Sequence, residues 1–364
     1  MARHSRLRFP IALLALAVAS SLPAAAADKP DFSNVVGAVD TVPAVPGASG
    51  SSASAASTAT AKPAEPADLW TPATPLARAA ADAELKADDP LRAQILLDRA
   101  HFSPGEIDGV SGSNTTRAIA AFRDANDLGA GDGLDEATWA ALRGDGDPVL
   151  VDYTITDEDA GQDFEKIPGD MMQKAKLEEL GYASIEEMLG ERFHASPGLL
   201  KKLNPDKAFT AGTTITVPNV AGAAPLAKAA KVRVDKSDGS VSLLDAAGGV
   251  YARFPATSGS EHDPLPIGDW KINGIARHPT FHYNPDLFWD ADSGHSKATI
   301  AAGPNNPVGV VWVDLSKEHY GIHGTPEPST IGKTQSHGCI RLTNWDAMRF
   351  ASAVAPGMVA VLQQ

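Results

Sequence analysis

The chain has 364 residues and is acidic, with 45 Asp and Glu against 31 Lys and Arg and a formal net charge of −14. Electrostatic affinity for nucleic acid requires clustered Lys and Arg, whereas the basic residues here are dispersed, so we expect no nucleic-acid partner. The negative charge also gives no reason to expect adsorption to anionic lipid. A single cysteine excludes a disulfide within the chain, and packing alone must therefore stabilise the fold.

The first residues, 1–27, have the order of a cleavable signal peptide. Three arginines precede an apolar run from Phe9 to Ala19, and small residues follow as far as Ala27. The run is shorter than the roughly 20 residues that span a bilayer, and no cysteine near it could carry a lipid. We therefore expect cleavage after Ala27 and an exported protein without an integral membrane span.

The next segment, residues 28–83, is dominated by Ala, Pro, Ser and Thr. Such a composition cannot bury enough apolar surface to offset the entropy of ordering. We predict a flexible linker between the export signal and the folded part. Removal of residues 1–27 would leave 28 Lys and Arg against 45 Asp and Glu, a net charge of −17.

Residues 84–145 show helical periodicity, which predicts a compact module of three helices. The expected N-caps are Asp89 for the first helix, Ser113 or Asn114 for the second, and Asp135 for the third.

The turns and the second helix of this module carry a distinctive sequence. Glu106-Ile107-Asp108-Gly109 is a turn, Thr116 to Phe122 is a helical segment, and Asp132-Gly133-Leu134-Asp135 precedes Trp139. This order resembles the small peptidoglycan-binding domain of cell-wall enzymes, which implies that the module binds the wall. The residues concerned mostly build turns and core, so a helical packing unit that binds nothing is the alternative.

Residues 150–220 are less regular. The pattern predicts strands at Tyr153–Thr156 and Thr213–Val217, with helices that begin after Ser184 and Ser196. The second half of this segment resembles a LysM module, which implies glycan binding. The first half departs from that family because about thirty residues intervene before the first helix. A spacer packed on the following domain is the alternative.

In residues 230–364 the hydrophobic period changes to two, which is typical of strands. The predicted strands are Lys231–Asp235, Ser240–Leu244, Val250–Phe254, Gly268–Ile272 and Val308–Val313, and one helix is predicted at Asn344–Ala353. The fold class is therefore multidomain α+β: a three-helix module, an α/β spacer and a β-rich domain with mixed sheets and a short helix.

Seven of the ten histidines fall between His262 and His337, which raises the question of metal. His319 and His323 could bind zinc from one helix turn, but the surrounding sequence predicts strand and loop. We therefore expect no metal site and no cofactor.

The lone cysteine, Cys339, is a candidate nucleophile. Its thiolate is the reactive form, and a neighbouring imidazole can take the proton. His337 lies two positions away and His323 sixteen, so the residues alone offer two candidate bases. Gly338 permits a positive φ and close approach of a substrate carbonyl, so backbone N–H groups there could meet an oxyanion.

Three motifs then carry a specific resemblance: His319 to Thr325, Ser329 to Lys333, and Ser336 to Leu342. They resemble the L,D-transpeptidase catalytic domain, or YkuD family, over residues 230–364. The resemblance implies that a thiolate attacks an L,D peptide bond in a peptidoglycan tetrapeptide stem, releases the terminal D-alanine and passes the acyl group to an amine.

By position, the resemblance makes Cys339 the nucleophile and His323 the base, steered by the carbonyl of Gly324. His337 is a further catalytic residue that shapes the site. The remaining implied site residues are the supports Ser336 and Gly338 and the substrate-binding Arg341.

The acceptor is left open by the sequence. It is the side-chain amine of another stem, giving a 3-3 cross-link, a lysine of an outer-membrane lipoprotein, or water, which would make an L,D-carboxypeptidase. A non-catalytic wall-binding scaffold is a further alternative. The expected partners are stem peptides and glycan, at the cell wall in the periplasm of a Gram-negative bacterium. The aromatic segment 278–289 is either a lid or a packed insertion.

Overall fold

The computed structural model describes residues 76–143 and 146–364. The predicted signal peptide, and the linker up to residue 75, lie outside the described residues. Within the described ranges, no helix combines the length and the apolar character needed to cross a bilayer.

The N-terminal part of the described chain is helical. Its helices are α1 (Ala80–Glu84), α2 (Pro90–Arg99), α3 (Ser113–Ala125) and α4 (Glu136–Leu142). Two predicted caps are confirmed, because the carboxylate of Asp89 accepts from the Leu91 N–H and that of Asp135 from the Thr138 N–H.

The predicted cap of α3 was wrong. The N-cap is Gly112, without a side-chain hydrogen bond. The side-chain amide of Asn114 instead donates to the carbonyl of Ile331 at 2.9 Å. The side chain of Asn114, which the local pattern assigned to the cap, thus contacts a segment more than 200 residues away instead.

The middle of the chain places helices between paired strands. The elements are β2 (Leu150–Thr154), α5 (Asp157–Ala160), α6 (Met171–Lys174), α7 (Ile185–Arg192), α8 (Pro197–Leu203) and β3 (Thr214–Pro218). Strand β2 pairs antiparallel with both β3 and the short β1 (Ala77–Arg78). Ser184 and Ser196 cap α7 and α8 as expected.

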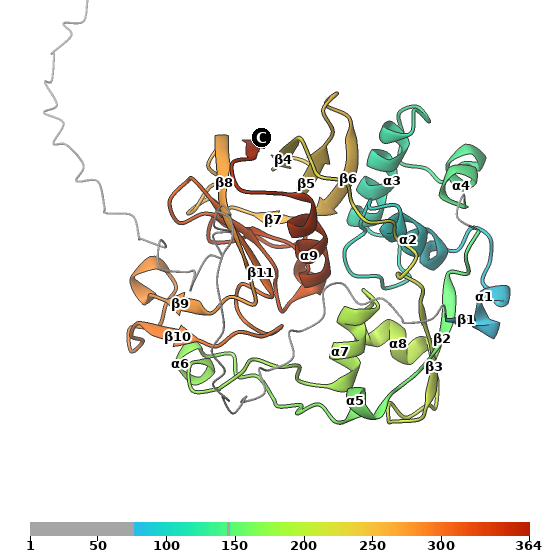
Figure 1. The fold of residues 1–364 in the computed structure, drawn as a ribbon, viewed down its shortest axis with the longest axis horizontal. Coiled ribbons are helices and arrows are strands. Elements are labelled where there is room, and N and C mark those ends of the chain that lie inside the picture. Colours follow the sequence, from blue (N-terminus) through green and yellow to red (C-terminus); the bar gives the residue numbers. More distant parts are fainter. Residues whose placement is uncertain (1–75, 144–145) are drawn as a thin grey trace, which may run out of the picture.

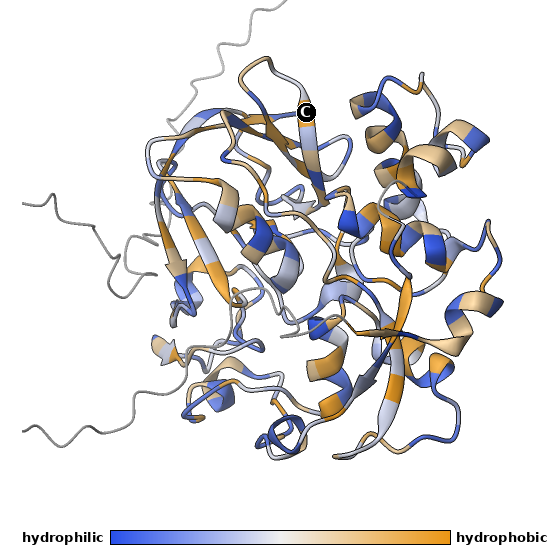
Figure 2. Ribbon diagram, turned by 45° about the vertical axis from the view of Figure 1, so that its right-hand side comes forward, coloured by the Kyte–Doolittle hydropathy of each residue, from blue (hydrophilic) through white to orange (hydrophobic). Residues whose placement is uncertain are grey.

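The helical module and the middle segment share one hydrophobic core. Leu97 and Phe122 from the first belong to the same buried cluster as Leu150, Leu189 and Ile215 from the second. Along the helices, hydrophobic and hydrophilic residues alternate (Figure 2), as expected of elements that bury one face. The two predicted segments therefore pack as one body.

The C-terminal part contains a mixed nine-stranded sheet in the order β6-β5-β4-β14-β8-β11-β12-β13-β7. Its strands are β4 (Lys231–Asp235), β5 (Ser240–Leu244), β6 (Val250–Pro255), β7 (Thr257–Ser258), β8 (Gly268–Arg277), β11 (Val311–Leu315), β12 (Gly321–His323), β13 (Ile340–Arg341) and β14 (Val359–Gln363). The pairs β4–β14 and β12–β13 are parallel, and the other pairs are antiparallel.

The predicted meander of β4, β5 and β6 and the predicted helix α9 (Asn344–Ala353) are confirmed. Strand β11 begins three residues later than expected, because Gly309 adopts a φ of 63° that ends extended pairing there. Helix α9 lies between the sheet and the helical module (Figure 1).

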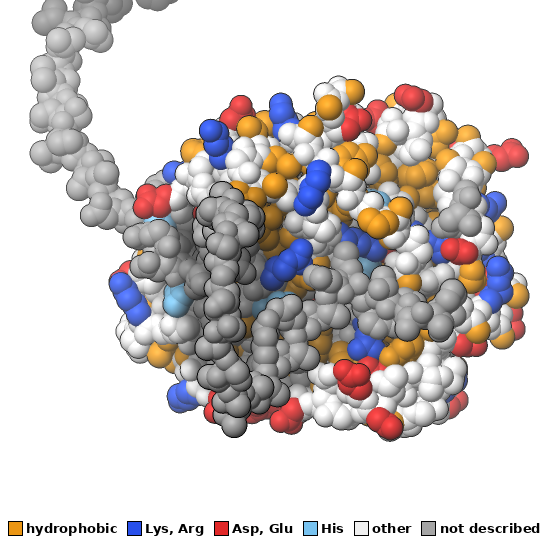
Figure 3. All heavy atoms as spheres, in the orientation of Figure 1, with side chains coloured by type: hydrophobic (Ala, Val, Ile, Leu, Met, Phe, Trp, Pro, Cys, Tyr) orange, Lys and Arg blue, Asp and Glu red, His pale blue; other side chains and the backbone are white. Residues whose placement is uncertain are grey.

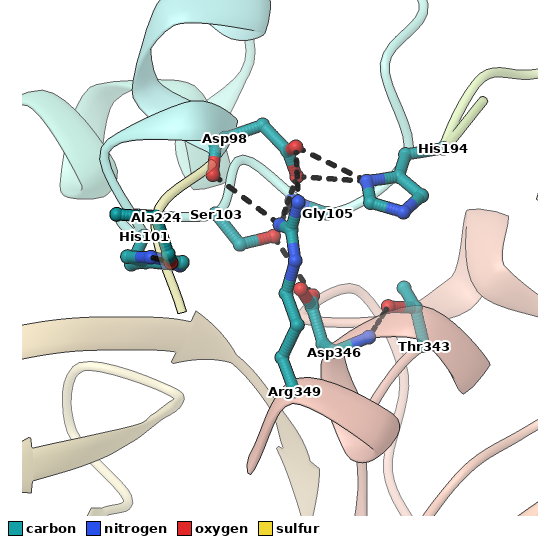
Figure 4. Close-up of polar contacts among 9 residues, drawn as sticks. All are labelled: Asp98, His101, Ser103, Gly105, His194, Ala224, Thr343, Asp346 and Arg349. Atoms are coloured by element: carbon teal, nitrogen blue, oxygen red, sulfur yellow. Dashed lines mark hydrogen bonds and ion pairs between the residues drawn. The ribbon is translucent and has the colours of Figure 1, made fainter. Parts of the chain in front are cut away.

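A buried polar network joins these parts (Figure 4). Arg349 on α9 pairs with Asp98 on α2, and His194 from the loop after α7 contacts the same carboxylate at 3.1 Å. Ser103 donates to Asp346 on α9 at 2.8 Å. Buried charges are costly unless paired, so this network fixes how the three segments meet.

Candidate active site

Two short parallel strands place the principal candidate residues. In the β12–β13 pair, Ile322 lies opposite Ile340 and His323 opposite Arg341. Cys339 directly precedes β13. Because side chains two apart on a strand share a face, Cys339, His323 and Arg341 are directed to one side of the sheet. All three line the same cavity of about 390 Å³.

His323 is held by its neighbours on two sides. Its ring stacks on Trp312, with centroids 5.4 Å apart and 21° between the planes. Its Nδ1 lies 2.6 Å from the carbonyl oxygen of Gly324. A carbonyl can only accept, so Nδ1 carries the proton and Nε2 is the basic nitrogen.

The pKa of His323 is lowered to about 3, first by burial and then by the positive charge of Arg341. Backbone carbonyls of Gly324 and Val308 oppose this shift. The imidazole is therefore neutral at physiological pH, which is the state that can accept a proton.

The pKa of Cys339 is raised to about 11, chiefly by burial. A backbone hydrogen bond at Gly321 and the charge of Arg341 act in the other direction. The thiol also contacts the carbonyl oxygen of His319 at 3.7 Å. The cavity therefore holds a neutral thiol and a neutral imidazole at rest, and a thiolate forms only when a base removes the proton.

Ser336 organises the loop that carries the cysteine. Its hydroxyl donates to the carbonyl of Cys339 at 2.6 Å and accepts from the N–H of Gly259 at 2.8 Å. Gly338 has a φ of 107°, and a Cβ there would lie 3.0 Å from the ring of Tyr320. The loop conformation thus requires glycine before the cysteine.

His337 is directed to a different partner. Its Nε2 lies 3.0 Å from a carboxylate oxygen of Asp290, and its ring packs edge-on against Phe288 and near Trp289. Both candidate bases line the cavity of Cys339. His337 is engaged by the segment that follows β9, whereas His323 is buried and held by Trp312 and Gly324.

The aromatic segment 278–289 forms part of the cavity wall. It contains β9 (Phe281–Tyr283), which pairs with β10 (Ala298–Ile300). The cavity is lined by Gly169, Asp170, Met171, Phe281, Tyr283, Phe288, Asp290, Ala291, Asp292, His295, Pro307, Val308, Trp312, His323, His337, Cys339 and Arg341.

The sequence pattern did not predict that the middle segment, residues 150–220, contributes to the cavity wall. Asp170 and Met171, at the start of α6, line the cavity although they precede the cysteine by more than 160 residues. Asp170 contacts His295 at 2.8 Å, and the other ring nitrogen of His295 contacts the hydroxyl of Tyr283 at 2.8 Å. The only sequence feature that could have indicated this contribution was the extra length before α7, at the point where the segment departs from the LysM pattern.

In the described ranges, 76–143 and 146–364, no group of three or more His, Cys, Asp or Glu side chains is placed to hold a metal ion. On the face shown in Figure 3, Lys and Arg side chains are scattered among acidic ones.

Two parts of the described chain match the models of known protein families. Residues 229–362 match the family model of the L,D-transpeptidase catalytic domain, YkuD, and residues 86–142 match the model described as "Putative peptidoglycan binding domain". Both resemblances are confirmed as family-model matches: residues 229–362 are similar to the L,D-transpeptidase catalytic domain, and residues 86–142 to a peptidoglycan-binding domain. Glycan binding by the LysM-like segment stays a prediction.

Curated relatives match over short stretches. The "Putative L,D-transpeptidase YkuD" of Bacillus licheniformis is 56% identical over 54 residues, 15% of this chain and 33% of the relative. "Putative L,D-transpeptidase YqjB" of Bacillus subtilis is 28% identical over 115 residues, 30% of this chain and 56% of the relative. The chain thus spans about a third to a half of these relatives.

Solved structures with similarity include L,D-transpeptidase 3 from Mycobacterium tuberculosis, at 17% identity and a TM-score of 0.32, covering 42% of this chain and 75% of that one. Another is the L,D-transpeptidase from Xylanimonas cellulosilytica, at 15% identity and a TM-score of 0.31, covering 75% of this chain and 92% of that one.

Proposed function

We propose that the protein is a cysteine-dependent L,D-transpeptidase that acts on peptidoglycan tetrapeptide stems through a thioester. The observation that carries this proposal is the common cavity of Cys339 and His323, in which Gly324 fixes the imidazole with Nε2 as its basic nitrogen. A non-catalytic scaffold would have no need of a base with a fixed tautomer in the same cavity as its only thiol.

In the first half-reaction, the sulfur of Cys339 attacks the carbonyl carbon of the L,D peptide bond while Nε2 of His323 takes the thiol proton. The oxyanion that forms is stabilised by backbone N–H groups at Gly338 and Cys339, a contribution often worth about 3 kcal/mol. When the carbon–nitrogen bond breaks, His323 returns the proton to the amine of the departing D-alanine. The enzyme then carries a thioester.

In the second half-reaction, the acceptor amine attacks the thioester carbon and loses a proton to His323. The carbon–sulfur bond breaks, and the imidazole returns the proton to the sulfur. Arg341 provides the positive charge in the cavity, and we assign it to a carboxylate of the stem. Ser336 supports the cysteine loop, and His337 shapes the wall through Asp290.

The thiol of Cys339 and the imidazole of His323 are both neutral at rest, which affects the reactivity of the thiol. Because burial keeps Cys339 protonated, the thiol is protected from the reactions of free thiolates in an oxidising compartment. This suits an exported enzyme of the cell wall, as the signal-like residues 1–27 predict, and we place it in the periplasm of a Gram-negative bacterium.

Purified protein incubated with disaccharide tetrapeptide tests the proposal, with products identified by mass spectrometry. Linked stems support transfer to the side-chain amine of a second stem, and shortened monomers indicate water as the acceptor. A parallel incubation with a lysine-bearing lipoprotein peptide tests the third acceptor. Absence of any product, with the protein folded, would leave the scaffold as the better account.

A further inference from the structure

Helix α7 of the middle segment reaches the start of α9 in the catalytic domain. Glu191, at its C-terminal end, is partly buried, and its Oε1 accepts a hydrogen bond from the side-chain amide of Asn344 at 2.7 Å. Asn344 is the first residue of α9 and is 2% exposed. The two residues thus connect a segment outside the matched catalytic domain to one inside it.

The amide of Asn344 is fixed by further contacts. Its Nδ2 also donates to the carbonyl of Pro304 at 3.1 Å, and its Oδ1 accepts from the N–H of Val310 at 3.2 Å. The same Oδ1 packs so closely on Gly324 and Gly309 that a Cβ at either position would lie within 2.3 Å of it. Rotation of this amide would therefore move the backbone at Gly324.

Gly324 is the residue whose carbonyl receives the Nδ1–H of His323. A continuous chain of contacts consequently runs from Glu191 through Asn344 and Gly324 to the imidazole. We propose that Glu191 is a positioning residue for His323, acting through Asn344, so that the accessory segment completes the catalytic geometry. This inference rests on the proposed function, in which His323 is the base.

The protonation state of Glu191 suits this role. Burial raises the pKa of Glu191 to about 8, and Glu187 one turn earlier adds to the shift, while the hydrogen bond from Asn344 opposes it. Tyr182 also interacts with this carboxyl. Glu106 and Glu327 line the groove of about 260 Å³ that Glu191 borders. At neutral pH the side chain is a neutral acid, so glutamine reproduces both its shape and its acceptor.

The test compares four variants of the full chain in the release of D-alanine from disaccharide tetrapeptide. Glu191→Leu removes the acceptor, and Glu191→Gln restores it. Ser103→Ala is the matched control, because it removes a different buried contact to α9, the one to Asp346. His323→Ala tests the proposed function itself.

We expect Glu191→Leu to lower kcat roughly tenfold to hundredfold with little change in KM, because small misplacement of a catalytic group is costly. Glu191→Gln and Ser103→Ala should retain kcat within about twofold at pH 7. Ionisation of Glu191 leaves the acceptor in place, because a carboxylate accepts the amide hydrogen bond at least as well as the neutral acid does, so wild type and Glu191→Gln should keep similar kcat values above about pH 8. If Glu191→Leu does not fold, Glu191→Met, whose unbranched side chain also lacks a strong acceptor, decides the question.

Wild-type kcat in folded Glu191→Leu, or an equal loss in Ser103→Ala, would overturn the inference while leaving the proposed function intact. Wild-type kcat in folded Glu191→Met would overturn it as well. Full activity of His323→Ala would instead overturn the assignment of the base, and with it both proposals.

Discussion

Arg349 on α9 and Asp98 on α2 form a two-point ion pair, with nitrogen–oxygen distances of 2.8 and 3.0 Å and both side chains buried. The pair links the peptidoglycan-binding-type module to the catalytic domain. Opposite charge and hydrogen bonding from Arg349 and His194 outweigh the desolvation of Asp98, so its pKa is held well below the ordinary value.

Asp98→Ala should strongly destabilise the protein, by about 3 to 5 kcal/mol, because it leaves the guanidinium of Arg349 buried without its counter-ion. The free energy of unfolding from urea titration measures this. The control is Lys201→Ala, which removes an exposed ion pair with Glu186 and should cost less than about 1 kcal/mol. Equal losses in both variants would contradict the role of the buried pair.

Ser336→Ala should slow acylation of Cys339 without unfolding the domain. The variant loses the hydrogen bonds to the Cys339 carbonyl and from the Gly259 N–H, which together are worth about 1 to 3 kcal/mol. The rate of D-alanine release in a single turnover checks this. Thr334→Ala, which removes an exposed hydroxyl contact to Thr330, should leave the rate unchanged, and an unaltered rate in Ser336→Ala would refute the prediction.

Gly321→Ala should impair both stability and activity. A Cβ at this position would lie 2.5 Å from the ring of Trp312, and Trp312 is the residue on which His323 stacks. Overpacking of this kind typically costs about 1 to 3 kcal/mol. Thermal unfolding and kcat measure the two effects. Gly133→Ala is the control, because no atom lies within 4 Å of a Cβ there; normal values for Gly321→Ala would be inconsistent with the packing described.

Asp346 makes stability depend on pH. Its pKa is raised to about 7, first by burial and then by the charge of Asp98. An acid with a raised folded pKa stabilises the fold fully below its unfolded value of about 4 and loses that contribution as pH rises through the folded value. Relative to wild type, Asp346→Asn should therefore gain stability as pH rises from about 4 to about 7. A stability difference that stays constant over this range would contradict the assignment.

Local patterns predicted much of the fold because their determinants are local. Asp89 and Asp135 cap their helices through nearby backbone N–H groups, and the alternation in β4 follows directly from burial of one face. The motifs around His323 and Cys339 likewise predicted the thiol and two histidines as candidate site residues, and these three side chains line one cavity.

Other features depend on contacts between distant parts of the chain. Asn114 does not cap α3 because Ile331 accepts its amide. Asp170 enters the cavity wall through His295, and Glu191 reaches the catalytic domain through Asn344. No local periodicity encodes such pairings, since each depends on how the segments pack against one another.

The intact mass of the protein after brief incubation with disaccharide tetrapeptide tests directly for a thioester on Cys339. The wild type should gain the mass of the substrate less D-alanine, located on Cys339. His323→Ala should form this adduct far more slowly, and Cys339→Ala should not form it. Release of D-alanine by folded Cys339→Ala, or an adduct on another residue, would contradict a thioester mechanism at Cys339.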